Sequence, residues 1–131
     1  MSKPKLEWAD KADVEDFEGA TKFFSLLTSE PNAKALVKSL RNAKVVELAA
    51  KDLLRAANLP LLPDSDSQVD ADLKRIDKGK PLPPVLLIRG DFSRGLPLTV
   101  ADGYHRICAV CYFDESAPVA CQIADIGDGK R

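Results

Sequence analysis

The chain has 131 residues and a mass of 14.3 kDa, which suits one domain that can bury a core without disulfide bonds. Its 19 Lys and Arg residues against 20 Asp and Glu give a net charge of −1, without the basic excess of a typical nucleic-acid-binding domain. No apolar run approaches the roughly 20 residues of a membrane-spanning helix, and the charged N-terminus is unlike a signal peptide, so we expect a cytoplasmic protein that does not contact membranes.

Two amphipathic helices are predicted at the N-terminus. The first is expected from about residue 14 to 27, with an apolar stripe of Val14, Phe17, Ala20, Phe24 and Leu27. Pro31 suits the first position of the second helix, because its missing N–H costs nothing there. The stripe of that helix is Ala33, Leu36, Val37 and Leu40. We expect residues 1–43 to form a helical hairpin extension with a structural purpose, and partner binding is the alternative.

The next segment has a mixed signal. Val45 and Val46 favour a strand, whereas the alanines that follow favour a helix. We expect a strand near 44–50 followed by a short helix over 52–56.

The centre of the chain predicts a helix and then two strands. The run Asp64-Ser65-Asp66-Ser67 is typical of a helix start, and apolar residues at helical spacing continue the helix until Gly79. Pro81–Pro84 stiffens the link into an apolar strand over 85–88. A turn-rich loop joins that strand to another over 96–101.

The last third predicts a helix over 104–113 and a final strand over 117–124, followed by a polar, mobile tail over 127–131. The fold class is therefore α+β. Residues 44–126 are expected to form a small mixed β-sheet packed with helices, preceded by the N-terminal hairpin.

One short segment carries recognisable chemistry, Ala101-Asp102-Gly103-Tyr104-His105-Arg106, between a predicted strand and a predicted helix. The first N–H groups of a helix lack intrahelical partners and attract anions. Gly103 allows a sharp turn, Arg106 could clamp a phosphate, and His105 could hydrogen-bond it. Tyr104 could stack on a base, and Asp102 could hold a cation or cap the helix. The alternative is an ordinary turn, with Arg106 solvated or paired with a nearby carboxylate.

The same segment supports a resemblance. Pro83-Pro84 precedes the strand over 85–88, and Gly103, Arg106 and Ala109 match the Gly-x-x-Arg-x-x-Ala signature of ParB-type domains. Sulfiredoxins carry Gly-Cys-His-Arg, which matches at Gly103, His105 and Arg106. Residues 44–125 therefore resemble the ParB/sulfiredoxin-type fold, and more narrowly small bacterial proteins often labelled ParB-like nuclease domains.

The resemblance implies a nucleotide site at Gly103, Tyr104, His105 and Arg106, because ParB proteins bind CTP and sulfiredoxins bind ATP through this motif. Tyr104 occupies the position of the sulfiredoxin catalytic cysteine, and a phenol cannot replace its thiolate, so we do not expect sulfiredoxin activity. Sulfiredoxins also use polar side chains on the helix before the Pro-Pro strand. The equivalent stretch, 68–75, carries different groups here.

Accessory roles are open to four further residues. Asp102 could assist Mg²⁺ bound with a nucleotide, and Arg75, Lys80 and Arg89 could extend the anion site. The bases also fit a solvated surface. The Cys108-Ala109-Val110-Cys111 run lies inside a predicted helix, so we expect core packing there and no metal site.

Three functions are compatible with these patterns. The first is a module that binds a nucleotide or another phosphate-bearing ligand, either without further reaction or as a phosphohydrolase that hydrolyses the ligand. The second is a non-enzymatic partner-binding or regulatory protein that uses the N-terminal helices. The third, a DNA-acting ParB-like nuclease, is less favoured because the charge is balanced.

Overall fold

The structure, a computed structural model, describes residues 6–128 and is an α+β domain. Its helices are α1 (Val14–Ser25), α2 (Glu30–Asn42), α3 (Ala50–Ala57), α4 (Ser67–Asp77) and α5 (Tyr104–Asp114). Its strands are β1 (Val45–Ala49), β2 (Val85–Arg89), β3 (Thr99–Asp102) and β4 (Pro118–Asp125). Single 3₁₀ turns lie at Phe92–Arg94 and Ile126–Asp128. No helix in the described part of the chain is long and apolar enough to span a membrane.

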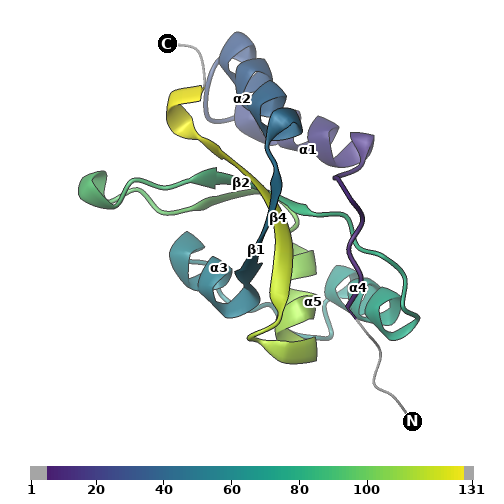
Figure 1. Ribbon diagram of the computed structural model, residues 1–131. Coiled ribbons are helices and arrows are strands. Elements are labelled where there is room, and N and C mark those ends of the chain that lie inside the picture. Colours follow the sequence, from purple (N-terminus) through teal and green to yellow (C-terminus); the bar gives the residue numbers. More distant parts are fainter. Residues whose placement is uncertain (1–5, 129–131) are drawn as a thin grey trace.

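The four strands form one mixed sheet in the order β1-β4-β2-β3 (Figure 1). The central pair, β2 and β4, is parallel, and β1 and β3 pair antiparallel with β4 and β2 at the two edges. Parallel strands are normally covered on both faces of the sheet, so the sequence of each strand is a continuous apolar run. The buried run Val85–Ile88 has this property.

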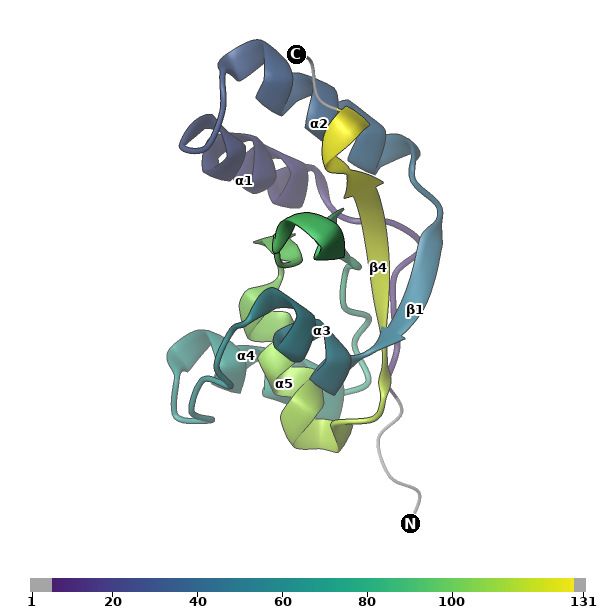
Figure 2. The same ribbon diagram turned by 90° about the vertical axis from the view of Figure 1, so that its left-hand side faces the viewer.

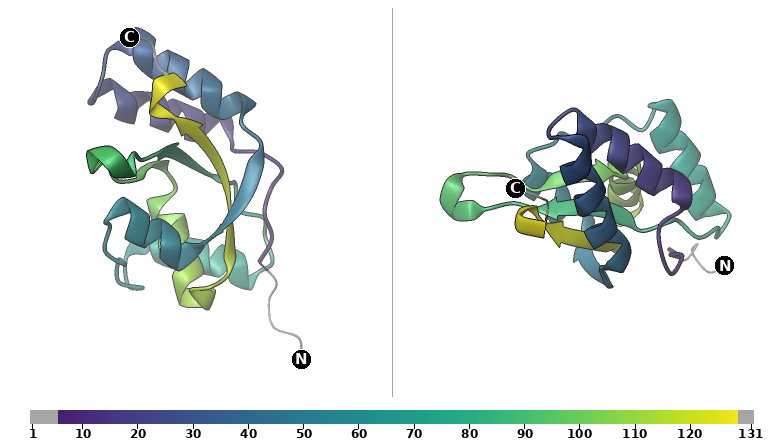
Figure 3. Two further views of the ribbon diagram at one scale, coloured as in Figure 1. Left: turned by 60° about the vertical axis from the view of Figure 1, so that its left-hand side comes forward. Right: turned by 90° about the horizontal axis from the view of Figure 1, so that it is seen from above.

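Helices cover both faces of the sheet, in three layers (Figures 2 and 3). Helices α1 and α2 pack on the face that presents Leu86, Ile88, Ala101 and Ala124. Helices α3, α4 and α5 pack on the face that presents Val85, Leu87, Val119 and Cys121. Because successive strand residues point to opposite faces, β2 and β4 supply side chains to both cores. The predicted N-terminal hairpin is thus one outer layer of the fold.

Local chemistry explains where the helices begin. The Ser29 side chain accepts a hydrogen bond from the backbone N–H of Asn32, and Pro31 lies in the first turn of α2. The Asp66 carboxylate accepts from the N–H groups of Gln68 and Val69 and so caps α4. The stripe predicted for α2 is buried as expected, and the strand followed by a helix after residue 44 is confirmed.

Three sequence-based expectations need correction. Val14 and Leu27 do not join the core stripe of α1: Val14, the first residue of the helix, is 70% exposed, and Leu27, which is 66% exposed, lies beyond its last residue, Ser25. The strand expected over 96–101 starts only at Thr99, because Leu96 instead pairs with Asp91 and closes the loop after β2 (Figure 1). Of the expected mobile tail, 127–128 belong to a 3₁₀ turn, and 129–131 lie outside the described residues.

A buried glutamine joins the α1–α2 layer to the sheet. Gln122 of β4 is 2% exposed, and its amide nitrogen donates to the carbonyls of Leu40 and Ala43 at the C-terminal end of α2. Its amide oxygen accepts from the N–H of Ala12, just before α1. One side chain therefore satisfies backbone groups at both ends of the helical hairpin.

Candidate functional site

A cavity of about 250 Å³ lies between α4 and the start of α5. Its lining residues are Gln68, Ala71, Asp72, Asp102, Gly103, His105 and Arg106. The first helical hydrogen bond of α5 runs from the N–H of Ile107 to the carbonyl of Gly103, at 2.9 Å. The N–H groups of residues 104–106 therefore precede the helical hydrogen-bond ladder.

Gly103 makes the predicted sharp turn, with φ of +108°. A Cβ built at this position would lie 2.5 Å from Val85 Cγ1 and 3.2 Å from Arg106 Nη1. The glycine is thus required by the backbone conformation and by the close packing of Val85 and the guanidinium. The atoms that approach this turn closely are those of the protein's own side chains, Val85 and Arg106.

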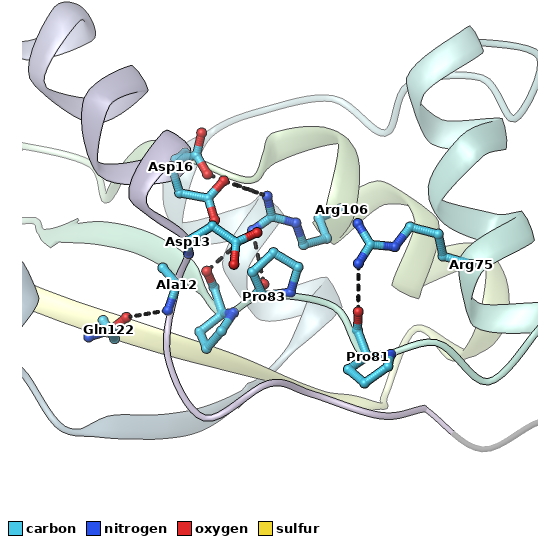
Figure 4. Close-up of polar contacts among 10 residues, drawn as sticks. Ala12, Asp13, Asp16, Arg75, Pro81, Pro83, Arg106 and Gln122 are labelled. Atoms are coloured by element: carbon cyan, nitrogen blue, oxygen red, sulfur yellow. Dashed lines mark hydrogen bonds and ion pairs between the residues drawn. The ribbon is translucent and has the colours of Figure 1, made fainter.

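Arg106 is held inside the protein by four partners (Figure 4). Its Nη1 donates to the carbonyl oxygens of Pro83, at 2.9 Å, and Pro84, at 3.2 Å. Its Nη2 contacts Asp16 Oδ1 at 3.3 Å and Asp102 Oδ2 at 3.4 Å. The side chain is only 12% exposed. The alternative of a carboxylate-paired arginine therefore describes this structure, and the clamping of a phosphate by Arg106 stays a prediction.

This pairing gives the Pro83-Pro84 segment before β2 a structural role. Proline has no N–H and disfavours helical geometry in the residue before it, so a Pro-Pro segment stays extended. The carbonyls of Pro83 and Pro84 are then available to Arg106, 23 and 22 residues further along.

Two carboxylates share the other end of the guanidinium. Burial, reinforced by the neighbouring Asp16, raises the pKa of Asp102 to about 7. Asp102 is thus engaged with Asp16 and Arg106 and is not an isolated cation ligand. Asp16 comes from α1, 90 residues before Arg106, and no sequence pattern identified it.

His105 and Tyr104 face different surroundings. His105 lines the cavity, and its Nε2 lies 3.9 Å from the Asp66 carboxylate. Tyr104 does not line the cavity, and its hydroxyl donates to the carbonyl of Pro60 at 2.6 Å. The two rings are neighbours with centroids 5.8 Å apart. Of the two, only His105 can meet a ligand inside the cavity.

Helix α4 supplies the opposite wall. Gln68 and Asp72 line the cavity, and burial raises the pKa of Asp72 while Arg106 and Arg75 oppose that shift. The sequence patterns did not predict either residue as part of the site. The resemblance to sulfiredoxins gave the one indication, because those proteins use polar side chains on the helix in this position.

The accessory basic residues do not gather at the cavity. Arg75 donates to the carbonyl of Pro81 at 2.7 Å (Figure 4), and Arg89 pairs with Asp125 at 2.7 Å. Neither they nor Lys80 line the cavity. A single basic face that joins these residues to Arg106 is therefore not observed among the residues around the cavity.

The cysteines and acids offer no metal centre within residues 6–128. No group of three or more His, Cys, Asp or Glu side chains in this range could hold a metal ion. Cys108 and Cys121 are fully buried core residues, and burial raises the pKa of all three thiols. The expectation of core packing for Cys108 is confirmed.

Comparisons with protein-family models, curated proteins and solved structures gave no match to this chain. The structure establishes the fold class, an α+β domain with a small mixed sheet. The resemblance to the ParB/sulfiredoxin-type fold stays a prediction that rests on the motif.

Proposed function

We propose that this protein is a small ParB/sulfiredoxin-like domain that binds a nucleotide or another phosphate-bearing ligand at the turn that begins α5. The observation that carries the proposal is the cavity at this turn. It is lined by Gly103, His105, Arg106 and Gln68, and α5 begins at its wall without an N-cap side chain. Helix N-termini bind anions through their N–H groups and the helix dipole.

The size and donors of the cavity suit phosphate groups. Small-molecule sites usually enclose about 300–1,000 Å³, so a cavity of about 250 Å³ would take the phosphates and leave the rest of a nucleotide outside. The imidazole of His105 and the amide of Gln68 provide hydrogen bonds from two helices.

Two acidic residues that line the cavity, Asp72 and Asp102, would repel a phosphate that binds without a cation. Burial raises the pKa of Asp102 to about 7, which reduces its negative charge near neutral pH and hence its repulsion of a phosphate. Mg²⁺ carried on the nucleotide phosphates would offset the remaining charge. The ligand screen is therefore run with and without Mg²⁺.

Thermal shift and calorimetry with CTP, ATP, GTP, sugar phosphates and inorganic pyrophosphate test the proposal. A ligand that binds the native state raises Tm by mass action.

We expect His105→Ala and Gln68→Ala to weaken binding about ten-fold or more each, as lost charge-assisted hydrogen bonds do. Tyr104→Phe and Asp77→Ala are matched controls on the same helices, outside the cavity lining, and should bind like wild type. Release of inorganic phosphate in the same samples reports hydrolysis. If none of these compounds raises Tm, the proposal is wrong.

The exposed apolar end of α1 favours a second candidate function, non-enzymatic partner binding. Leu26 is 83% exposed, and Leu27 and Phe23 are exposed beside it. Gathered apolar side chains on a surface commonly mark an interface. Sedimentation of wild type against Leu26→Lys tests the simplest partner, a second copy. Association that the substitution abolishes would support this role, and a wild type that stays monomeric at high concentration would exclude that partner.

A further inference from the structure

We propose that Asp16 of α1 is a built-in competitor for the ligand at Arg106. Its carboxylate would occupy the position of a phosphate oxygen, and ligand binding would loosen the first turn of α1. The inference rests on the proposed function and names the regulation of the same site. It follows from how the partners of Arg106 divide between its two terminal nitrogens.

The two ends of the guanidinium differ in how firmly they are held. Nη1 donates to the carbonyl of Pro83 at 2.9 Å and to that of Pro84 at 3.2 Å, both within the usual range of N–H···O hydrogen bonds. Nη2 lies 3.3 Å from Asp16 and 3.4 Å from Asp102. Ion-pair hydrogen bonds are normally about 2.7–2.9 Å long, so both carboxylate contacts are stretched. The Nη2 contacts are the ones that a better acceptor could replace, with the guanidinium still fixed through Nη1.

The carboxylate and the ligand offer Nη2 the same chemistry. Phosphate oxygens and carboxylate oxygens bind guanidinium groups in the same way, so they compete for one donor. Asp16 and Asp102 also crowd each other at Nη2, which is one reason that the pKa of Asp102 is raised. Removing Asp16 from this position would relieve that repulsion and leave Asp102 with Arg106.

Displacement of Asp16 would disturb the first turn of α1. Asp16 is 13% exposed, and its other oxygen, Oδ2, accepts from the N–H of Asp13 at 3.0 Å in the cap of the helix. One turn later α1 approaches the same carboxylate pair, because a Cβ on Gly19 would lie 3.6 Å from Asp102 Oδ1. With helix and cavity wall this close, a ligand that takes the place of Asp16 must also disturb the start of α1.

The affinity test compares two neighbouring substitutions on α1. Asp16→Asn keeps the size of the side chain and an oxygen for the helix cap, but it removes the negative charge at Nη2. Glu15→Gln removes the same charge one residue earlier, from an exposed position. By calorimetry with inorganic pyrophosphate and with CTP, we expect Asp16→Asn to lower Kd about ten-fold, within the usual range of coupling between sites. Glu15→Gln should match wild type.

A second measurement needs no substitution. Amide hydrogen exchange of wild type with saturating pyrophosphate should become faster in residues 16–19, whereas exchange in α2 should not become faster. Simple stabilisation by a ligand would slow exchange in both helices. If Asp16→Asn fails to fold, this measurement decides alone.

The outcomes separate the two proposals. Equal Kd values for the two variants, with no faster exchange in α1, overturn the competitor role and leave the ligand site intact. Binding by Asp16→Asn with none by wild type supports both proposals. Absence of binding by wild type and by Asp16→Asn overturns the ligand site and this inference with it.

Discussion

Gly103 and Arg106 depend on each other for packing, which gives the Gly-x-x-Arg spacing a structural meaning at the residue scale. The guanidinium passes so close to the turn that a Cβ at residue 103 would lie 3.2 Å from its Nη1. The arginine in turn ties the start of α5 to the Pro83-Pro84 segment and to α1. The motif therefore stabilises the junction of three segments, in addition to any role with a ligand.

The first prediction concerns Gly103→Ala. The substitution combines an unfavourable φ of +108° with a contact of 2.5 Å to Val85, so we expect it to lower the free energy of unfolding by about 2–5 kcal/mol. Gly95→Ala is the control, because Gly95 has φ of +69° with open space around it and should lose only about 1 kcal/mol. Urea unfolding measures both. Equal losses would show that packing against Val85 does not matter.

The second prediction follows from Asp102. Burial and Asp16 raise the pKa of Asp102 from an ordinary 3.8 to about 7. Between these values the native state keeps a proton that the unfolded chain has lost, so the free energy of unfolding falls as pH rises from about 4 to 7 and then levels off. The slope from one group is at most about 1.4 kcal/mol per pH unit.

Asp102→Asn tests this dependence because it keeps a neutral side chain at every pH. We expect the unfolding free energy of wild type to fall more between pH 5 and pH 8 than that of the variant, measured by urea unfolding at each pH. Parallel profiles for the two proteins would show that Asp102 titrates as an ordinary carboxylate.

At the scale of the elements, the sequence was most informative where one segment determines its own structure. The stripe Ala33, Leu36, Val37 and Leu40 correctly predicted the buried face of α2, because 3.6-residue periodicity is a local property. The order of a strand and then a helix after residue 44 was also predicted from local preferences, although Ala50, expected in the strand, begins α3. The exposure of Val14 and Leu27 was missed, because the part of α1 that packs in the core runs only from Phe17 to Phe24 and the helix ends at Ser25. Periodicity does not show where the covering layer ends.

The third prediction concerns Gln122, the side chain that connects the α1–α2 layer to the sheet. Gln122→Met keeps the length of the side chain but removes the hydrogen-bond partner of the Ala12 N–H and of the Ala43 carbonyl, whereas the Leu40 carbonyl keeps the N–H of Ala43. We expect a loss of about 2–4 kcal/mol in unfolding free energy, since each buried unsatisfied group costs about 1–3 kcal/mol. Gln68→Met, at an exposed position, should change stability by less than about 0.5 kcal/mol. Similar values for the two variants would contradict a joining role for Gln122.

At the scale of the whole molecule, the α+β class was predictable and the complete site was not. The alternation of helix and strand signals, with a turn at Gly103, indicated the class and the place of the cavity. One wall of the cavity comes from α4, and one partner of Arg106, Asp16, comes from α1 and lies 90 residues away in the sequence. Such a pairing depends on how α1 docks on the sheet, and a single sequence holds no local signal for it. The same sheet links the two cores, because β2 alternates its side chains between them.

The fourth prediction is that the two helical layers unfold together. Cys121 is fully buried on the α5 side of the sheet, and burial raises the pKa of its thiol to about 12, so a thiol reagent should modify it only after unfolding. The substitution Val37→Cys places a reporter thiol in the α1–α2 core, where Val37 is 3% exposed. Because removing the α1–α2 layer would expose Leu86 and Ile88 of β2, we expect both thiols to react with the same rate and the same urea dependence, as followed by mass spectrometry. Faster labelling of the reporter thiol in α2 at low urea, with Cys121 still protected, would instead show that the hairpin layer opens on its own.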